Sequence, residues 1–171
     1  FSGRWHLRSL PRAQAGFSLL ELSVVLFIIS VLTALAVPGY KHVQTNACTS
    51  AVINDLRVFA GAFQNYASER GDWPSVTVAP GEIPPGLQPY LSATTWGQPS
   101  PIGGAYGWAA NSLQQGERYR AILTISSVGG NKVTAERQQL LDIDRRLDDG
   151  DLATGNFRLG YRNQPFIVIE H

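Results

Sequence analysis

The longest apolar stretch in the chain runs from Phe17 to Val37, and Glu21 is its only charged residue. A helix of these 21 residues would rise about 31 Å, which matches the hydrocarbon core of a bilayer at about 30 Å. The pattern therefore predicts a membrane-spanning helix. A carboxylate inside such a helix costs about 2–3 kcal/mol or more, depending on its depth, so we expect Glu21 to have a function and a partner.

Beyond this stretch the apolar positions take on a helical spacing. They recur at intervals of four, three, four and three residues, which is typical of a helix with one buried face. Gly71 then supplies a stop signal. We expect one long helix from about Phe17 to Arg70, with a membrane half over 17–38 and an amphipathic half over 39–70. The apolar positions of the second half are Val52, Leu56, Phe59, Phe63 and Tyr66.

Pro38 and Gly39 lie where these two halves meet. Proline has no backbone N–H and its ring collides with the preceding turn, so it breaks or kinks a helix. We therefore predict a kink at Pro38 and Gly39.

The remaining residues, 71–171, predict a globular domain. Alternating apolar positions indicate strands over 105–110, 118–126, 157–161 and 166–169, with a turn over 111–116. Pro165 indicates that the last strand is an edge strand or begins there. We expect a helix over 135–147, with Thr134 as N-cap and Glu136 in its first turn. The predicted fold class is α+β: a long N-terminal helix whose amphipathic half packs on an antiparallel sheet of three to four strands.

The segment 72–104 is rich in proline and glycine but also carries recurring large apolar residues. This combination indicates an ordered loop rather than a linker. The apolar residues either pack into the core or line a ligand groove. They are Trp73, Leu87, Tyr90, Leu91 and Trp96.

Charge indicates an orientation in the membrane. The chain has 14 basic and 13 acidic residues, but the residues before Phe17 include three arginines, Arg4, Arg8 and Arg12, and no acid. This basic leader predicts a cytoplasmic N-terminus and an extracytoplasmic domain. The sequence shows no basic patch of the kind that binds nucleic acid.

Composition narrows the function classes further. Cys48 is the single cysteine, so no internal disulfide is expected. The three histidines lie in the leader, beside the apolar stretch and at the C-terminus, so no catalytic or metal-histidine cluster is indicated and we expect no enzyme. The chain contains no methionine, so we expect a fragment of the gene product or a start codon read differently.

Three interpretations fit the N-terminal region. One is a secretory signal peptide cut at the small-residue site Ala34-Leu35-Ala36, although the apolar stretch is longer than usual and contains Glu21. Another is a plain signal anchor that holds an unrelated domain outside the membrane.

The third interpretation is a family resemblance. Gly16-Phe17-Ser18-Leu19-Leu20-Glu21 resembles the prepilin cleavage and methylation motif of type IV pilins and type II secretion pseudopilins. The resemblance implies that 1–16 is a leader, that a membrane aspartyl protease cuts between Gly16 and Phe17, and that the new N-terminal Phe17 is methylated. It also implies a pilin-like fold, and Pro38 lies where family members often have a proline.

The resemblance further implies how such a subunit works. In the filament, Glu21 of one subunit would meet the Phe17 amine of its neighbour, since two charges in a low dielectric are tolerated best as a pair. The implied partners are further copies of the chain, related minor pseudopilins, the prepilin peptidase/methyltransferase, the inner-membrane assembly platform and membrane lipid. The implied location is the bacterial inner membrane, crossed once, with the domain in the periplasm.

Several functions agree with these features. The first is a structural subunit of a type II secretion pseudopilus, which the lack of a C-terminal cysteine pair favours. The second is a major or minor type IV pilin for adhesion, motility or DNA uptake. A third, of another class, is a membrane-anchored extracytoplasmic binding module that uses the tryptophan-rich loop.

Five aspartates crowd the end of the helix expected over 135–147. Negative charge is disfavoured at a helix C-terminus, so either nearby arginines or a bound cation should offset it. Ca²⁺ prefers carboxylate and carbonyl oxygens, and some major pseudopilins hold calcium in a loop of the outer domain. The alternative is a simple turn, in which the carboxylates accept backbone N–H bonds and Gly150 ends the helix. The candidate ligands are Asp142, Asp144, Asp148, Asp149 and Asp151.

Overall fold

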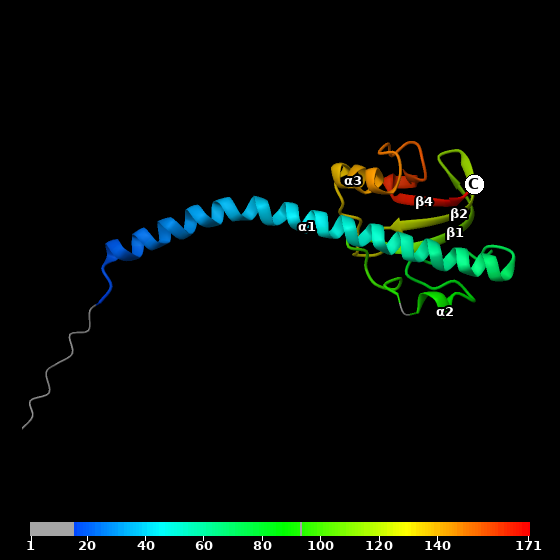
Figure 1. Ribbon diagram of the computed structural model, residues 1–171, viewed down its shortest axis with the longest axis horizontal. Coiled ribbons are helices and arrows are strands. Elements are labelled where there is room, and N and C mark those ends of the chain that lie inside the picture. The colour runs from blue at the N-terminus through cyan, green and yellow to red at the C-terminus, as the bar shows by residue number, and fades with distance from the viewer. Residues whose placement is uncertain (1–15, 93) are drawn as a thin grey trace, which may run out of the picture. The chain divides into compact units, whose positions relative to one another are not determined.

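The computed structural model describes residues 16–92 and 94–171. The chain divides into two compact units between Lys41 and His42. The first unit holds the start of the long helix, and the second holds the rest of that helix together with all the other elements (Figure 1). The elements are α1 (Leu19–Arg70), α2 (Gln88–Leu91), β1 (Ala105–Gln114), β2 (Glu117–Ser126), α3 (Arg137–Leu147), β3 (Phe157–Leu159), a 3₁₀ turn (Tyr161–Asn163) and β4 (Pro165–Glu170).

Helix α1 confirms the predicted long helix. The Ser18 hydroxyl accepts a hydrogen bond from the Leu20 amide at 3.2 Å, which caps the first turn. The helix ends where Gly71 adopts a positive φ of 79° and its amide donates to the Ala67 carbonyl. The helix is continuous through Pro38 and Gly39, and a kink there stays a prediction.

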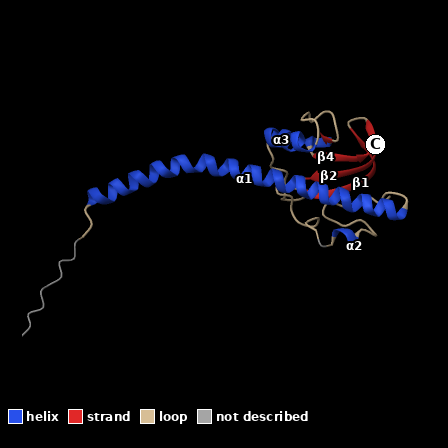
Figure 2. Cartoon of the chain, in the orientation of Figure 1, coloured by secondary structure: helices blue, strands red, loops and turns tan. Residues whose placement is uncertain are grey.

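The four strands form one antiparallel sheet in the order β1-β2-β4-β3. Figure 2 shows β2 between β1 and β4. The amphipathic half of α1 packs on this sheet, which confirms the expected α+β arrangement. Its buried face includes four of the five residues that the spacing predicted, with Tyr66 only partly buried, and also Thr49, Ile53 and Ala62. The four predicted positions are Val52, Leu56, Phe59 and Phe63, all fully buried.

The turn between β1 and β2 is shorter than the predicted 111–116. Both strands extend further, and the turn is Gln115-Gly116, with φ values of 49° and 91°. Two successive residues with positive φ match the right-handed twist of a hairpin. Asn111 does adopt a positive φ of 52°, but within β1, where it is left out of the pairing with β2. The sequence signal for a turn at Asn111 therefore marks a local irregularity in the strand.

Other boundaries also differ from the prediction. Helix α3 begins at Arg137 with Glu136 as N-cap, and the Thr134 hydroxyl donates to the Ile102 carbonyl instead of capping the helix. Strand β3 ends at Leu159, because Tyr161 opens the 3₁₀ turn. Pro165 is the first residue of β4, which confirms one of the two alternatives for it, but β4 lies between β2 and β3 and so is not an edge strand. The short helix α2 was not predicted.

Aromatic side chains dominate the core between α1, the sheet and the loop 72–104. Phe59 contacts Trp96 and Tyr106 edge-on, with ring centroids 5.1 and 4.7 Å apart. Phe63 stacks on Trp108 at 4.2 Å. Such pairs add about 0.5–1.5 kcal/mol each beyond the apolar area they bury. The loop 72–104 is therefore fixed to the domain by its own core residues.

Candidate functional site

The first candidate site is the start of α1. Gly16 and Phe17 precede the first helical residue, and the Phe17 side chain is 85% exposed. The bond between them thus lies in non-helical, accessible backbone, as cleavage by a protease requires. The leader arginines, and the rest of the predicted leader before Gly16, lie outside the described residues.

Glu21 lies in the first turn of α1 and is exposed. The unsatisfied amides of a helix N-terminus favour a negative charge there. With the residues that the structure describes, Glu21 makes no hydrogen bond or ion pair, so its carboxylate is available to an outside partner. Its predicted role in assembly stays a prediction.

The surface around Glu21 is apolar on every side. All residues from 16 to 37 are exposed in the described chain. The hydroxyls of Ser23, Ser30 and Thr33 donate to backbone carbonyls three or four residues earlier, at 2.7–2.8 Å. The hydroxyls of these small polar residues therefore need no hydrogen-bond partner from a neighbouring molecule. Helix α1 is long and apolar enough here to cross a membrane.

The second candidate site is the acidic turn after α3. The structure brings together one oxygen from each of Asp144, Asp148 and Asp149, all within 4.8 Å of one another. Asp142 lies apart and pairs with Arg145 at 3.0 Å. Asp151 lies apart as well, and its carboxylate accepts the Ala153 amide at 3.1 Å.

Asp144 is fully buried, and neither of its carboxylate oxygens has a hydrogen-bond partner among the described residues. Burial, followed by the charges of Asp149 and Asp148, raises its pKa to about 6, and the Gly150 amide opposes this rise only in part. Sequence reasoning missed this burial. The signal was present, because Asp144 follows Leu140 by four residues and so lies on the apolar face of α3.

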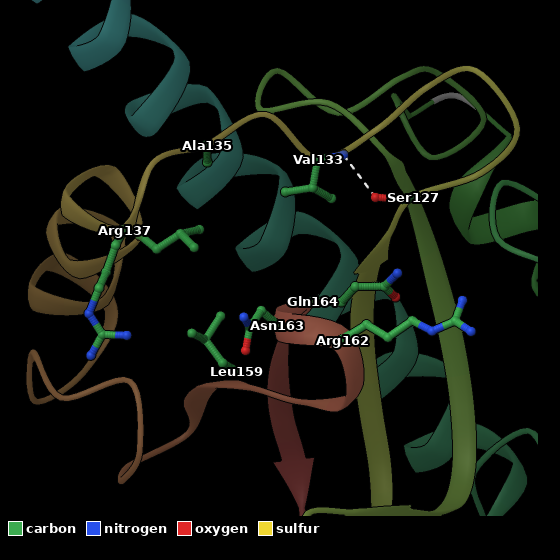
Figure 3. A pocket seen from close by; sticks show the side chains of 9 residues that line it. Ser127, Val133, Ala135, Arg137, Leu159, Arg162, Asn163 and Gln164 are labelled. Carbon is green, nitrogen blue, oxygen red and sulfur yellow. Dashed lines mark hydrogen bonds between the residues drawn. The ribbon is translucent and has the colours of Figure 1, made fainter.

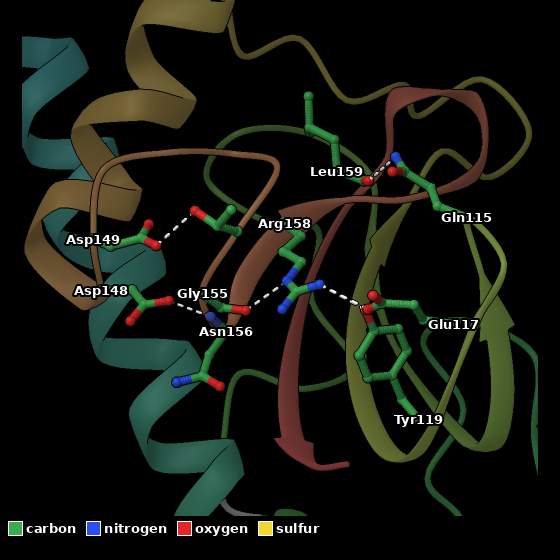
Figure 4. Close-up of polar contacts among 10 residues, drawn as sticks. Gln115, Glu117, Tyr119, Asp148, Asp149, Gly155, Asn156, Arg158 and Leu159 are labelled. Atoms are coloured by element: carbon green, nitrogen blue, oxygen red, sulfur yellow. Dashed lines mark hydrogen bonds and ion pairs between the residues drawn. The ribbon is translucent and has the colours of Figure 1, made fainter.

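The loop after α3 holds the other two carboxylates in place (Figure 4). The Asn156 amide donates to Asp148, while the Thr154 hydroxyl and the Asp151 amide donate to Asp149 at 2.7 and 2.9 Å. The hydrogen bond from the Asp151 amide, followed by the one from Thr154, lowers the pKa of Asp149. The predicted turn is thus present, and Thr154 and Asn156 are site residues that the sequence did not single out.

The structure offers little to the ligand-groove interpretation of the loop 72–104. Leu87, Leu91 and Trp96 are fully buried, and the Trp96 ring N–H donates to the Glu82 carbonyl at 2.8 Å. These side chains are core residues. A separate hollow of about 350 Å³ lies beside Leu140 and Leu159. Figure 3 shows that its Arg137 and Arg162 side chains extend away from each other, so they do not converge on one ligand.

Comparisons with known proteins agree with the first site. Residues 11–37 match the model of the prokaryotic N-terminal methylation motif. The fimbrial protein EcpC of Eikenella corrodens is 36% identical over 72 residues, which cover 42% of this chain and 47% of that protein. The type II secretion system core protein G of Klebsiella pneumoniae is 34% identical over 80 residues, which cover 47% of this chain and 52% of that protein. The chain thus spans about half the length of the curated relatives it matches.

A solved structure extends the likeness to the fold. The major type IV pilin PilA1 from Clostridium difficile superimposes with a TM-score of 0.51 at 16% sequence identity, over 76% of this chain and 98% of that one. The chain therefore carries a prepilin-type N-terminal motif on a pilin-like fold. This confirms the resemblance that Gly16, Phe17 and Glu21 indicated. The matched proteins carry the names of pilins and of a secretion-system protein.

Proposed function

We propose that this protein is a structural subunit of a filament, and specifically of a type II secretion pseudopilus. The observation that carries the proposal is the start of α1: an accessible Gly16–Phe17 bond, a Glu21 carboxylate with no partner among residues 16–92 and 94–171, and an apolar helix exposed on every side. A binding module with a plain anchor would need the apolar helix but neither the cleavage motif nor the carboxylate.

Assembly follows from the chemistry of the cut. Cleavage after Gly16 creates a positively charged α-amine on Phe17, four residues before the negative Glu21. When the apolar helices of two subunits associate away from water, each charge is tolerated only if it is paired. The Glu21 carboxylate of one subunit then binds the Phe17 amine of the next, and an axial shift that separates them leaves two charges unpaired.

The same features support a location for the subunit in the cell. The chain would enter the bacterial inner membrane with its basic leader in the cytoplasm and its domain in the periplasm. A prepilin peptidase/methyltransferase would then process the motif. An inner-membrane assembly platform would add the subunit to others of its kind and to related minor pseudopilins.

A type IV pilus is the second candidate. The fimbrial relative and the pilin fold of the solved neighbour favour it, while the similarity to a secretion-system core protein and the single cysteine favour the pseudopilus. The gene should be deleted in its native host. Loss of protein secretion with surface pili intact would support the pseudopilus, and loss of pili with secretion intact would support the pilus.

Processing and assembly can be tested directly. The full chain is produced together with a prepilin peptidase, and its intact mass is measured. We expect a chain that begins at Phe17 and carries one added methyl group. The Glu21→Gln variant should still be cut but should form few or no filaments by electron microscopy, because one partner of the charge pair is lost.

Glu136→Gln is the matched control, since it makes the same change at an exposed position of the second unit, and it should assemble normally. A chain that begins at Val37, or one that stays uncut, would contradict the filament proposal. Normal filaments from Glu21→Gln would contradict the pairing of charges.

A further inference from the structure

We propose that the acidic turn after α3 in one copy of the chain docks against the hollow at the start of α3 in the next copy. This inference rests on the filament proposal and adds a second contact between the subunits. The hollow has a volume of about 350 Å³. Apolar side chains and two arginines line it, and no acidic side chain of the described residues does so. The apolar residues include Val133, Leu140 and Leu159, and the arginines are Arg137 and Arg162.

The charges at the two ends of α3 have signs that an isolated helix disfavours. A helix N-terminus favours negative charge, and a C-terminus favours positive charge. Helix α3 instead begins at Arg137 and has no acidic residue in its first turn, and the side chain of its N-cap Glu136 makes no capping hydrogen bond. Three exposed aspartates, Asp148, Asp149 and Asp151, follow its last residue. These signs become favourable when the end of one such helix faces the start of another.

The arginines near the acidic turn are engaged within the chain. Arg145 pairs with Asp142 at 3.0 Å, and Arg146 donates to two polar side chains of α1. Arg158 pairs with Glu117 at 2.9 Å, although its charge still acts on the turn from a distance. The turn therefore keeps a local excess of negative charge.

The two arginines of the hollow are available to a partner. Both are exposed, and Arg137 makes no hydrogen bond or ion pair with a described residue. Arg162 lies over the ring of Tyr161, with its guanidinium carbon 5.2 Å from the ring centroid, and Tyr161 is itself 72% exposed. Tyrosine and arginine are enriched among the residues that dominate binding at interfaces. Because the two arginines extend apart (Figure 3), they fit a broad surface with several carboxylates better than one small ligand.

Asp144 is the observation that points to a cationic partner for the turn. A buried carboxylate is normally satisfied by hydrogen bonds or by a cationic group. Both oxygens of Asp144 are buried without a hydrogen-bond partner in the described chain, and one of them lies within 4.8 Å of oxygens of Asp148 and Asp149. A guanidinium that binds Asp148 and Asp149 from outside brings the missing positive charge next to Asp144.

The contact has to join different copies. Helix α3 has 11 residues and is therefore about 16 Å long, which keeps the acidic turn away from the hollow of its own chain. The basic leader predicts that all copies enter the membrane in the same orientation, so two neighbours make one such contact and each keeps one surface free. A contact between two different surfaces does not close into a pair, so it extends a stack of copies.

This contact is secondary to the packing of the apolar helices. Exposed ion pairs are individually weak. We therefore expect the contact to form only where the apolar helices already hold the copies side by side, which raises the effective concentration of one surface near the other. The second unit alone is expected to stay monomeric.

The test is cysteine cross-linking in filaments of the full chain, with Cys48 replaced by serine. Ser127→Cys places a thiol at the hollow, and Ala153→Cys places one beside the acidic turn. Oxidation of the chain that carries both should give a ladder of dimers, trimers and longer products, because each copy then has one thiol for each of two neighbours. Ser92→Cys with Ala153→Cys is the matched control, since Ser92 is also an exposed serine but lies outside both surfaces, and it should give no ladder.

Charge reversal shows whether the arginines carry the contact. Arg137→Glu combined with Arg162→Glu should reduce the ladder at least about fivefold, because like charges then face each other. Arg70→Glu combined with Arg118→Glu changes the net charge equally at exposed positions outside both surfaces, and it should leave the ladder unchanged.

The outcomes separate this inference from the filament proposal. Filaments that give no ladder with Ser127→Cys and Ala153→Cys would overturn the contact and leave the filament proposal standing. Equal ladders from the two charge-reversed chains would overturn the contact as well. If the unaltered chain forms no filaments, the filament proposal falls, and this inference falls with it.

Discussion

At the scale of single residues, a hydrogen-bond network ties α1 to the sheet. The hydroxyl of the buried Tyr106 donates to one oxygen of Asp55 at 2.7 Å, and the Thr95 hydroxyl donates to the other at 2.9 Å. Burial, followed by the hydrogen bond to Asp55, raises the pKa of Tyr106, so the hydroxyl keeps its proton. Asp55 thus links the helix to both β1 and the loop 72–104.

Removing that hydroxyl should destabilise the domain. We predict that Tyr106→Phe lowers the free energy of unfolding by about 1.5–3 kcal/mol, the range for hydrogen bonds to charged groups, as measured by chemical denaturation of the full chain in detergent. Tyr161→Phe is the control, because Tyr161 is 72% exposed, and it should change stability by less than about 0.5 kcal/mol. Equal effects of the two variants would show that the Asp55 network does not stabilise the fold.

At this scale, a site could be predicted from the sequence only where its residues lie close together along the chain. Gly16, Phe17 and Glu21 lie within six successive residues, so their spacing alone indicated the motif. The burial of Asp144 depends instead on the loop 148–156 folding back over α3, and the contact of Thr154 with Asp149 depends on the same fold. Spacing indicated five aspartates there, but only packing selects three of them.

At the scale of elements, the two faces of α1 in the second unit have opposite surroundings. Phe59 is fully buried against Trp96 and Tyr106, while its neighbour Val58 is 45% exposed. Adjacent helix residues point about 100° apart, because a turn contains 3.6 residues. The packing of the helix against the sheet therefore depends on one stripe of side chains.

That stripe can be tested with a pair of neighbours. Phe59→Ala should lower the free energy of unfolding by about 3–5 kcal/mol, since it leaves a cavity against the Trp96 and Tyr106 rings. Val58→Ala should change it by less than about 0.5 kcal/mol. Denaturation followed by tryptophan fluorescence measures both, and similar losses from the two variants would place the buried face of the helix elsewhere.

Periodic elements were the ones that sequence could predict. The spacing from Val52 to Phe63 predicted the helix and most of its buried face, and alternation located all four strands. Helix α2 was missed because its four residues are too few for a period, and its place is set by the burial of Leu91. The turn after β1 was misplaced because Asn111 adopts its positive φ inside the strand.

At the scale of the whole molecule, the two units have surfaces that suit different surroundings. Among residues 16–37, 39–92 and 94–171, every buried residue lies between Thr49 and Val168, within the second unit. The described residues of the first unit, by contrast, expose almost only apolar side chains. Water suits the surface of the second unit, whereas the first needs lipid or other helices around it.

This contrast predicts how a shortened chain behaves. Residues 42–171 contain the whole described core, so this fragment should fold and remain monomeric in water without detergent. Light scattering after gel filtration measures its mass, and a cooperative thermal transition shows that it is folded. Aggregation of the fragment, or the lack of a transition, would mean that the first unit contributes to the stability of the second.

The single carboxylate on the apolar helix has one more consequence. Two apolar helices that lie side by side make nearly the same contacts at any axial offset. Apolar packing alone therefore does not set the axial spacing of successive copies. Glu21 breaks that translational symmetry at one point, and Ser23, Ser30 and Thr33 add no competing points because their hydroxyls turn inward to their own backbone. The Glu21 carboxylate would then set the axial spacing of successive copies. Moving this carboxylate by one helical turn should change that spacing by about 5.4 Å.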